Sequence, residues 1–444
     1  MNILSFFACF ETLVAAVTIG QLTAIGQAIL TMTGRITMLS ISRWAEKGGS
    51  YRTIQRFFGS VLPWQAMFAR FFETHLFNPD HEYILAGDET VVSKSGKQTF
   101  GIDRFFSGLK GKVIRGLSFF VLSVVDTVER KSYPLAVAQT VKSEGEKQTS
   151  KSRGKKKTKK PKATKGRRKG SLNRDKNEIR LSPELLRISE LLSFLRKLTR
   201  HFIKLKYLAM DGHFGHHQAV LMARANGLEL ISKLRKDAAI YEKYDGTYSG
   251  RGAKKKYGAR LKYDLLPPTY LRKSEQEKEI ITNYYQGVFL HKEFAKEINA
   301  VIIVKINLKT RKLGHAILFS SDVGLSWEKL VDYYSLRFQI EFNFRDAKQH
   351  FGLEDFMNTT KIGVENAANL SFLMCNVSAK LLKTDKEKAV GINDLKTQFR
   401  GIKYAVLTLK KVLKKPEPIL MKQIIEEVSR LGSIYQPKST ASTA

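Results

Sequence analysis

The stretch from Ser326 to Phe351 constrains this chain most, because it predicts one helix with an unusual polar face. It reads SWEKLVDYYSLRFQIEFNFRDAKQHF, and four polar residues fall on a stripe about 60° wide if the helix is continuous. These residues are Tyr334, Arg337, Glu341 and Lys348. Glu341 and Lys348 are too far apart to pair within a helix, so a carboxylate flanked by cations suits a place where a metal and a polyanion meet. The alternative is a solvated stripe with weak helix ion pairs.

The charge of the chain indicates a polyanionic partner. Its 444 residues carry 76 Lys and Arg against 41 Asp and Glu, a net charge of +35, although 43% hydrophobic residues is ordinary for a globular protein. Nucleic acid, held through its phosphates, is the simplest such partner. Two cysteines, Cys9 and Cys375, form neither a thiol-rich zinc site nor a disulfide framework. We therefore expect a cytoplasmic, nucleoid-associated protein.

The first 78 residues are predicted to be helical. Ile3–Met32 is apolar, but it lacks a basic start and is interrupted by polar residues, which favours buried helices over a membrane span. Three short helices separated at glycines are expected after it: Arg35–Glu46, Ser50–Phe58 and Pro63–Leu76. This is a helix-turn-helix outline, although a plain helical bundle shares it. The residues placed to contact DNA are Arg43, Arg52 and Arg56.

Strand-rich and helical segments alternate along the rest of the chain. Strands are expected at Tyr83–Lys94, Val113–Thr127, Tyr133–Val141, Lys206–Met210 and Leu228–Leu234. Four more are expected at Ala259–Leu266, Glu279–His291, Asn299–Leu308 and Ala316–Ser320. Helices are expected at Ser182–Phe202, His216–Asn226, Val364–Leu382, Asp394–Leu413 and Pro418–Leu431. The tract Lys151–Lys169 has twelve basic and no acidic residues among nineteen, so it is predicted to be a solvated linker.

Two aspartates follow apolar strand patterns in the same way. Asp88 comes after Tyr-Ile-Leu-Ala-Gly, and Asp211 comes after Lys-Tyr-Leu-Ala-Met. Adjacent strands would bring the two carboxylates together, and Glu341 would supply a third. Three oxygen ligands suit a pair of Mg²⁺ ions that activate a water or a 3′-hydroxyl. Each aspartate taken alone has an alternative role as a turn residue or a helix cap.

The string Tyr334-x2-Arg337-x3-Glu341-x6-Lys348 resembles the YREK signature of bacterial insertion-sequence DDE transposases of the IS-four type. Asp88-x-Thr90 and Asp211-Gly212-x-Phe214-Gly215 are also typical of that family. The resemblance covers about residues 80–375. It implies an α/β, ribonuclease-H-like core in which Asp88, Asp211 and Glu341 are the catalytic metal ligands. Tyr334, Arg337 and Lys348 would then hold DNA phosphates around the scissile end.

On this resemblance we divide the chain into a helical DNA-recognition domain, a catalytic core, a β-rich insertion, a C-terminal helical region and a disordered tail. The corresponding residues are 1–78; 79–236 with 322–360, containing a basic linker at 142–180; 237–321; 361–436; and 437–444. Family members that pass through a DNA hairpin carry such an insertion, and in some of them a tryptophan there stacks on a flipped base. All three tryptophans of this chain lie outside the insertion, which puts a hairpin mechanism in doubt. Residues that would stack instead are Tyr248, Tyr284, Tyr285 and Phe289.

Three histidines beside the second aspartate offer another metal site. His213, His216 and His217 have the spacing of zinc ligands on a helix, but the oxygen-rich set around Asp211 favours a hard cation. The residue next to Asp88, Glu89, points to the opposite strand face and is not expected to be a ligand.

The sequence thus predicts a Mg²⁺-dependent DNA transposase, with Mn²⁺ able to substitute, that acts on double-stranded DNA as a homodimer. It would cleave transposon ends and join the 3′-hydroxyl to target DNA. Two alternatives stay open: an inactive, transposase-derived DNA-binding protein, and a structure-specific nuclease without strand transfer.

Overall fold

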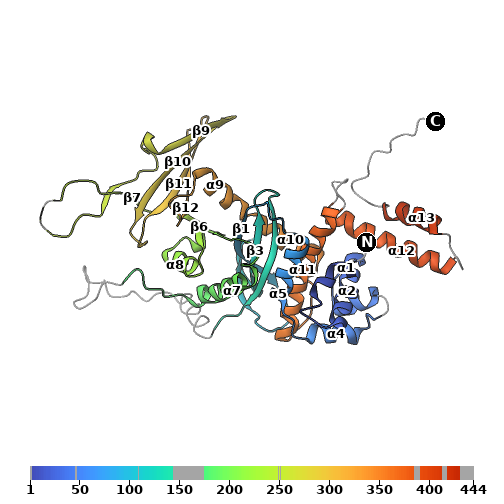
Figure 1. The fold of residues 1–444 in the computed structure, drawn as a ribbon. Coiled ribbons are helices and arrows are strands. Elements are labelled where there is room, and N and C mark those ends of the chain that lie inside the picture. Colours follow the sequence, from blue (N-terminus) through green and yellow to red (C-terminus); the bar gives the residue numbers. More distant parts are fainter. Residues whose placement is uncertain are drawn as a thin grey trace, which may run out of the picture.

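The computed structural model describes residues 3–45, 48–108, 110–143, 175–248, 250, 252–384, 391–412 and 418–430. These residues form an elongated molecule with one large sheet (Figure 1). The core strands of the sheet lie beside a helical body, and its remaining strands project away from that body. Most of the predicted basic linker at 142–180, including the tract Lys151–Lys169, falls outside the described residues. The predicted tail at 437–444 lies outside them as well.

The centre of the sheet has the strand order of a ribonuclease-H-like fold. Strands β4, β3, β1, β5 and β6 lie side by side in that order; β3 is antiparallel to β4 and β1, whereas β1, β5 and β6 run parallel. Their bounds, with the hairpin strand β2, are β1 Tyr83–Ser93, β2 Asp103–Ser107, β3 Lys112–Asp126, β4 Lys131–Thr140, β5 Tyr207–Met210 and β6 Glu229–Leu234. β3 is buried over most of its length because helices cover both faces of the sheet. The predicted α/β, ribonuclease-H-like fold is confirmed, as are the five core strands predicted from the sequence.

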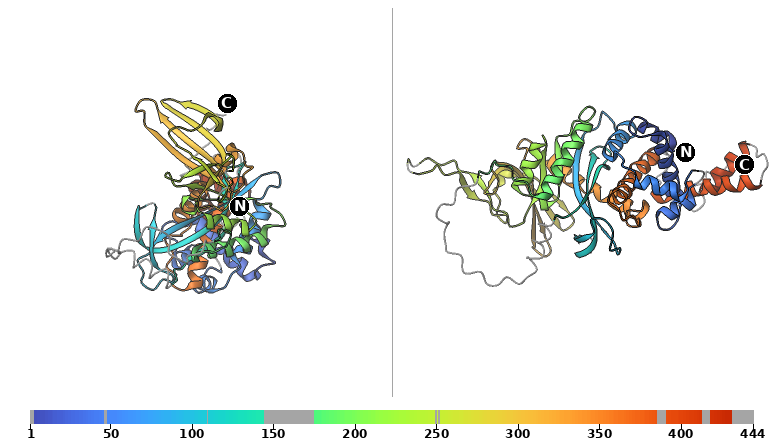
Figure 2. Two further views of the ribbon diagram at one scale, coloured as in Figure 1. Left: turned by 90° about the vertical axis from the view of Figure 1, so that its left-hand side faces the viewer. Right: turned by 90° about the horizontal axis from the view of Figure 1, so that it is seen from below.

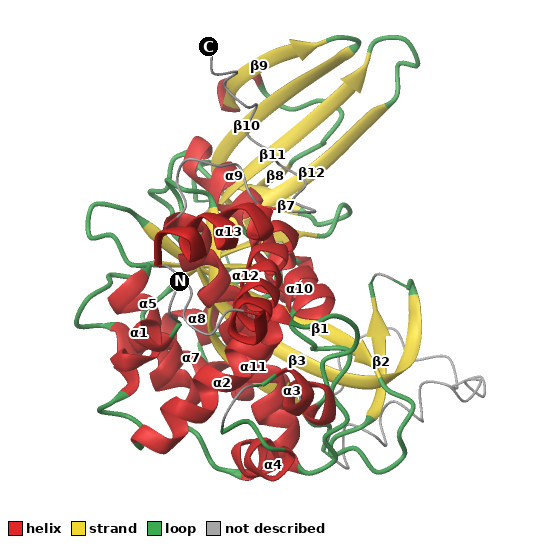
Figure 3. Ribbon diagram, turned by 90° about the vertical axis from the view of Figure 1, so that its right-hand side faces the viewer, coloured by secondary structure: helices red, strands yellow, loops and turns green. Residues whose placement is uncertain are grey.

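The β-rich insertion at 237–321 continues this same sheet instead of forming a separate one. Strand β12 pairs antiparallel with β6, and β11, β10, β7 and β8 follow outward, with β9 also paired to β10. The bounds are β7 Ile240–Lys243, β8 Tyr257–Arg260, β9 Leu271–Glu277, β10 Ile280–His291, β11 Ile298–Asn307 and β12 Leu313–Ser320. Figure 3 shows these strands projecting beyond the helices. The sequence predicted four of them; β7, β9 and the hairpin strand β2 were missed.

Helices cover the two faces of the core sheet. α7 (Pro183–Thr199) and α8 (His217–Ala225) pack on one face, and α9 (Trp327–Leu336) and α10 (Gln339–His350) pack on the other. The side chains of Asp88 and Glu89 separate these faces: Asp88 bonds Arg337 beside α10, whereas Glu89 lines a hollow with residues of α7. The predicted active-site face is therefore the one covered by α9 and α10.

Helices from both ends of the chain form one body. α2, α4 and α5 pack against α11 or α12, so the predicted N-terminal and C-terminal helical regions share a core (Figure 1). The bounds are α1 Leu4–Phe7, α2 Ala16–Thr31, α3 Met38–Trp44, α4 Tyr51–Gly59, α5 Trp64–His75, α11 Lys361–Thr384, α12 Ile392–Val412 and α13 Pro418–Arg430. The buried amide of Asn366 in α11 accepts from Trp64 Nε1 at 2.7 Å and donates to the carbonyls of Phe58 and Ser60. Figure 2 shows α12 and α13, in red, at the end of the molecule away from the yellow-green strands.

The single helix predicted over Ser326–Phe351 is wrong, because the chain forms two helices. α9 ends at Leu336 and α10 begins at Gln339, with a tight turn at Arg337 and Phe338. The amide of Phe338 bonds the carbonyl of Ser335, only three residues back. α9 packs against β5, β6, β11 and β12, whereas α10 packs against β1, β3 and β4. Because the sheet is twisted, one straight helix could not contact all of these strands. The break lets α9 and α10 each pack against a different part of the sheet.

Within the part of the chain that the structure describes, every helix is too short or too polar to cross a membrane.

Candidate active site

The two aspartates singled out in the sequence lie at one level of the parallel strands. β1 and β5 pair Gly87 with Met210, and this register continued by one residue sets Asp88 beside Asp211. Asp88 lies inside its strand, because β1 continues along β3 to Ser93, close to the predicted end at Lys94. It is β5 that ends at Met210, directly before Asp211. Because β5 ends well before β1 does, the sheet is left open at the carboxyl end of β5, where both side chains lie.

Glu341 approaches the same place from α10. The pKa of Asp88 is raised to about 6, chiefly by burial, with smaller contributions from the charges of Asp211 and Glu341 and an opposing effect of Arg337. The three carboxylates therefore act on one region. Among the described residues, the group whose ligand atoms all lie within 4.8 Å of one another is a different one. The carboxylate oxygens of Asp88, Asp211 and Glu341 are therefore more widely spaced than that.

Arg337 supplies the counter-charge at this site. Its Nη1 lies 2.7 Å from Asp88 Oδ2, and the two side chains are 14% and 21% exposed. Arg337 lies between α9 and α10, so the helix break sets where its guanidinium reaches. Arg337 Nε is buried without a hydrogen-bond partner among the described residues. The guanidinium lies 5.7 Å from the ring centre of Tyr334, whose pKa is raised by burial.

A tight turn after β5 holds Asp211 in place. Asp211 Oδ1 accepts the amide of His213 at 3.1 Å, which caps a single 3-10 turn, Gly212–Phe214. Ser232 Oγ in β6 donates to the Asp211 carbonyl at 2.7 Å. A Cβ atom on Gly215 would lie 2.2 Å from the carbonyl oxygen of Lys233, so only glycine lets this turn approach β6. The Asp-Gly-x-Phe-Gly motif is thus explained by close backbone packing.

Lys348, the last residue of the signature, is engaged inside the protein. Its Nζ donates to the carbonyl of Val91 in β1 at 3.0 Å, and burial lowers its pKa. The contact ties the second half of α10 to β1. Its predicted phosphate contact stays a prediction.

The arginines predicted to contact DNA lie on the helical body. Arg43 in α3 and Arg52 and Arg56 in α4 are exposed, while Ile54 and Phe57 of α4 face the core. Ser50 caps α4 through Oγ, which accepts the amide of Thr53. The α3–turn–α4 arrangement leaves the arginine face of α4 open to a partner.

The three histidines near Asp211 have separate partners. His213 Nε2 lies 3.2 Å from Glu184 Oε2, and His217 Nε2 lies 2.6 Å from the carbonyl of Lys176. Burial lowers the pKa of His216, which precedes α8. Among the described residues these rings form no shared cluster with a carboxylate pair. The zinc alternative has no geometric support here.

The aromatic residues proposed for base stacking differ in accessibility. Phe289 is 1% exposed and therefore cannot stack on a base without rearrangement, which corrects that expectation. Tyr248 is exposed, and its hydroxyl donates to the carbonyl of Gly252 at 2.7 Å. Trp327, outside the insertion in sequence, lies against Tyr284 of β10 with ring centres 5.1 Å apart. The sequence did not predict this contact, because Tyr284 and Trp327 are far apart along the chain.

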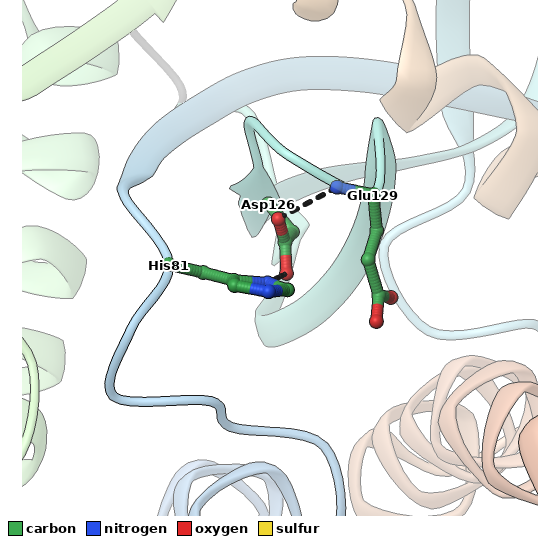
Figure 4. Close-up of side chains that lie close together, drawn as sticks. All are labelled: His81, Asp126 and Glu129. Atoms are coloured by element: carbon green, nitrogen blue, oxygen red, sulfur yellow. Dashed lines mark hydrogen bonds and ion pairs between the residues drawn. The ribbon is translucent and has the colours of Figure 1, made fainter.

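A histidine-carboxylate group lies away from the active site, at the turn between β3 and β4. Among the described residues, His81, Asp126 and Glu129 are the group whose ligand atoms all lie within 4.8 Å (Figure 4). Each already has partners. His81 Nδ1 lies 2.7 Å from Asp126 Oδ2, and His81 Nε2 lies 2.9 Å from the side-chain nitrogen Nδ2 of Asn78. Asp126 Oδ1 accepts the amides of Val128 and Glu129, while the Glu129 carboxylate pairs with Lys383. We interpret the group as a structural clamp.

An open hollow of about 620 Å³ adjoins Asp211 and Tyr334. The basic residues that line it, which the sequence analysis did not single out, are Lys233, Arg235 and Lys236. The signal was present as the run Lys-Leu-Arg-Lys, which spans the end of a predicted strand. Basic residues are common throughout this chain, so the run alone does not distinguish a site.

Strand order and carboxylate placement together define a ribonuclease-H-like protein with an acidic site at the carboxyl edge of β5. Residues 6–284 match the family model described as DDE superfamily endonuclease, and the chain belongs to this family. The match contains Asp88 and Asp211 and ends before Glu341.

Among solved structures, the chain is similar to "Cryo-EM structure of piggyBac transposase synaptic complex with hairpin DNA". That similarity has a TM-score of 0.36 and 10% identity, and covers 81% of this chain and 60% of the other. The chain thus spans less than two thirds of that transposase. No curated protein matches the sequence.

Proposed function

We propose that this endonuclease-family protein is a DNA transposase of the IS-four type, which cleaves transposon ends and transfers the 3′-hydroxyl strand into target DNA. The observation that supports the proposal is that Asp88 and Asp211 are level on two parallel strands, and that Glu341 on the facing helix is close enough to influence the pKa of Asp88. The unbroken spacing Tyr334-x2-Arg337-x3-Glu341-x6-Lys348 supports the finer assignment.

The acidic site fits divalent metal ions. All three donors are carboxylates, the ligand type that Mg²⁺ prefers, and Arg337 already places a positive group against Asp88. Asp88, Asp211 and Glu341 would hold Mg²⁺ or Mn²⁺, which supplies charge stabilisation and an activated oxygen nucleophile for phosphodiester cleavage.

The protein's own groups bind and orient the DNA. Arg337 is suited to leave Asp88 for a DNA phosphate, since a guanidinium can bind either anion through paired N–H donors. Tyr334, on the same side, would contact the neighbouring part of the DNA backbone. The exposed Arg43, Arg52 and Arg56 would recognise the transposon end. Two protomers, one on each end, would form the homodimeric DNA complex.

The metal proposal is tested with isosteric changes at each carboxylate. Asp88→Asn, Asp211→Asn and Glu341→Gln should each reduce Mn²⁺- or Mg²⁺-dependent cleavage of end-containing DNA by orders of magnitude. Binding of the same DNA in EDTA should be largely retained, because cationic side chains make most phosphate contacts. Glu89→Gln is the matched control: it is adjacent to Asp88 but on the opposite strand face, so cleavage should persist. Full activity in any one of the three variants would contradict the ligand assignment.

Strand transfer separates this proposal from a nuclease. Pre-cleaved ends with a free 3′-hydroxyl, incubated with target plasmid, should yield joined products. Cleavage of intact ends without joining of pre-cleaved ends would favour the structure-specific nuclease. DNA binding without either reaction would favour the inactive DNA-binding protein.

A further inference from the structure

A lysine on the third parallel strand lies level with the two aspartates. β5 and β6 pair Ala209 with Ile231, and this register continued by two residues sets Asp211 beside Lys233. Asp88, Asp211 and Lys233 therefore follow one another across β1, β5 and β6. Residues at one level of parallel strands point to the same face, so all three project toward α9 and α10.

The position of Lys233 is fixed from both sides. β6 pairs with β12 through Lys233 and Leu318, and the turn after Asp211 packs against the Lys233 backbone because Gly215 carries no Cβ. Ser232 fastens the same segment to the Asp211 carbonyl. Such fixing of the backbone is what a side chain needs to hold a ligand beside a reacting group.

Lys233 differs from the signature cations in its contacts. Arg337 is paired with Asp88, and Lys348 is bound to the Val91 carbonyl. Lys233 is half-buried, lines the hollow beside Asp211 and Tyr334, and has no ion pair or hydrogen bond from its ammonium group among the described residues. Lysine with its charge near a cleft and no protein partner is poised for an external anion.

We propose that Lys233 binds a backbone phosphate of the DNA strand lying in this hollow, beside the acidic site at Asp211. The inference rests on the proposed function and adds a contact on the β6 side of the site. Arg235 and Lys236, which follow it, would extend the contact along the strand. Arg235 is partly offset by Asp237, whose carboxylate lies 3.2 Å away, so Lys233 is the residue to test first.

The salt dependence of DNA affinity tests the contact. The logarithm of affinity falls with the logarithm of salt concentration by about 0.9 per neutralised phosphate, and each contact adds to the slope. The loss of one contact is therefore measurable even though the chain carries a net charge of +35. A fluorescein-labelled, mixed-sequence DNA duplex is titrated with the full-length protein in EDTA over a KCl series.

We expect Lys233→Ala and Lys233→Gln to weaken binding on the order of tenfold at low salt, because a charge-assisted hydrogen bond is lost. The slope should become shallower by about 0.9, and Lys233→Arg should restore both values. The control is Lys204→Ala, an exposed lysine before β5 and thus at the other end of that strand, which should leave the slope unchanged.

The outcomes distinguish the inference from the proposed function. An unchanged slope for Lys233→Ala, or one that shifts equally for Lys204→Ala, overturns the phosphate contact even if the wild-type protein cleaves DNA. Weaker binding that arises only from a lower melting temperature, with arginine failing to restore it, overturns it as well. Absence of cleavage by the wild-type protein would instead remove the proposed function while the slope still reports on Lys233.

Discussion

At the scale of single residues, the ion pair between Asp88 and Arg337 balances two opposing effects on the Asp88 carboxyl group. Burial opposes ionisation of Asp88, and the adjacent guanidinium opposes that effect, so its pKa reaches only about 6. A metal ion bound by Asp88 would do the same work as Arg337. On the proposed function, Arg337 would leave Asp88 for a DNA phosphate when metal and DNA bind.

Lys348 has a structural contact that can be measured directly. Lys348→Ala removes the hydrogen bond to Val91, leaves that carbonyl without its partner, and should lower the free energy of unfolding by about 1–2 kcal/mol. Urea denaturation of the full-length protein measures this. Lys361→Ala, at the exposed start of α11, is the control and should change stability by less than about 0.5 kcal/mol. If Lys348→Ala were as stable as the control but bound DNA more weakly, the ammonium group would serve DNA alone.

At the scale of elements, the turn after β5 depends on glycine for packing and not for backbone conformation. Gly215→Ala would place a Cβ 2.2 Å from the Lys233 carbonyl oxygen, so β6 and the turn must separate. We expect a loss of about 2–3 kcal/mol in the free energy of unfolding and a large loss of cleavage, since Asp211 moves with the turn.

The control for this change is Gly20→Ala in α2, where an added Cβ would meet no atom within 4 Å. Alanine there should stabilise the helix by about 0.5–1 kcal/mol and leave cleavage intact. Thermal unfolding and end-cleavage assays on both variants make the comparison. Equal stability of Gly215→Ala and the wild-type protein would contradict the packing explanation.

Sequence pattern predicted the core elements well where each segment carries its own signal. β1, β3 and β4 are rich in β-branched and aromatic residues, and Ser182 and Pro183 mark the start of α7. The break between α9 and α10 had no such signal, since Ser326–Phe351 contains neither glycine nor proline. It arises from packing against two parts of a twisted sheet. The Lys348–Val91 contact joins residues 257 positions apart, and no local pattern encodes it.

For the whole molecule, the sheet explains why an insertion tolerated between Asp211 and Glu341 does not disturb the site. β12 returns the chain to β6 by antiparallel pairing, and α9 starts soon after β12 ends at Ser320. The insertion therefore begins and ends at the edge of the core. This arrangement was not predictable from the sequence, because it depends on which strand β12 pairs with. The same connection places Trp327 and Tyr284 side by side.

The charge of the whole molecule yields the last prediction. The tract Lys151–Lys169 holds twelve of the basic residues, so removing it leaves 35 − 12 = +23, still a strongly basic protein. Deleting the tract should weaken binding to any duplex and make the salt dependence shallower, because fewer phosphates are neutralised and fewer counterions released. Preference for transposon ends over mixed-sequence DNA should remain, since low-complexity basic segments contact phosphates and not base edges.

The measurement compares affinities for both DNAs over a KCl series, in the full chain and in the deletion. As a control, replacing the tract by a neutral Gly/Ser linker of equal length should behave like the deletion, because length is kept and charge is not. Loss of end preference with an unchanged salt slope would make the tract a sequence reader. A shallower slope in the deletion but not in the Gly/Ser replacement would show that the tract acts through its length, by letting β4 and α7 pack correctly, and not through its charge.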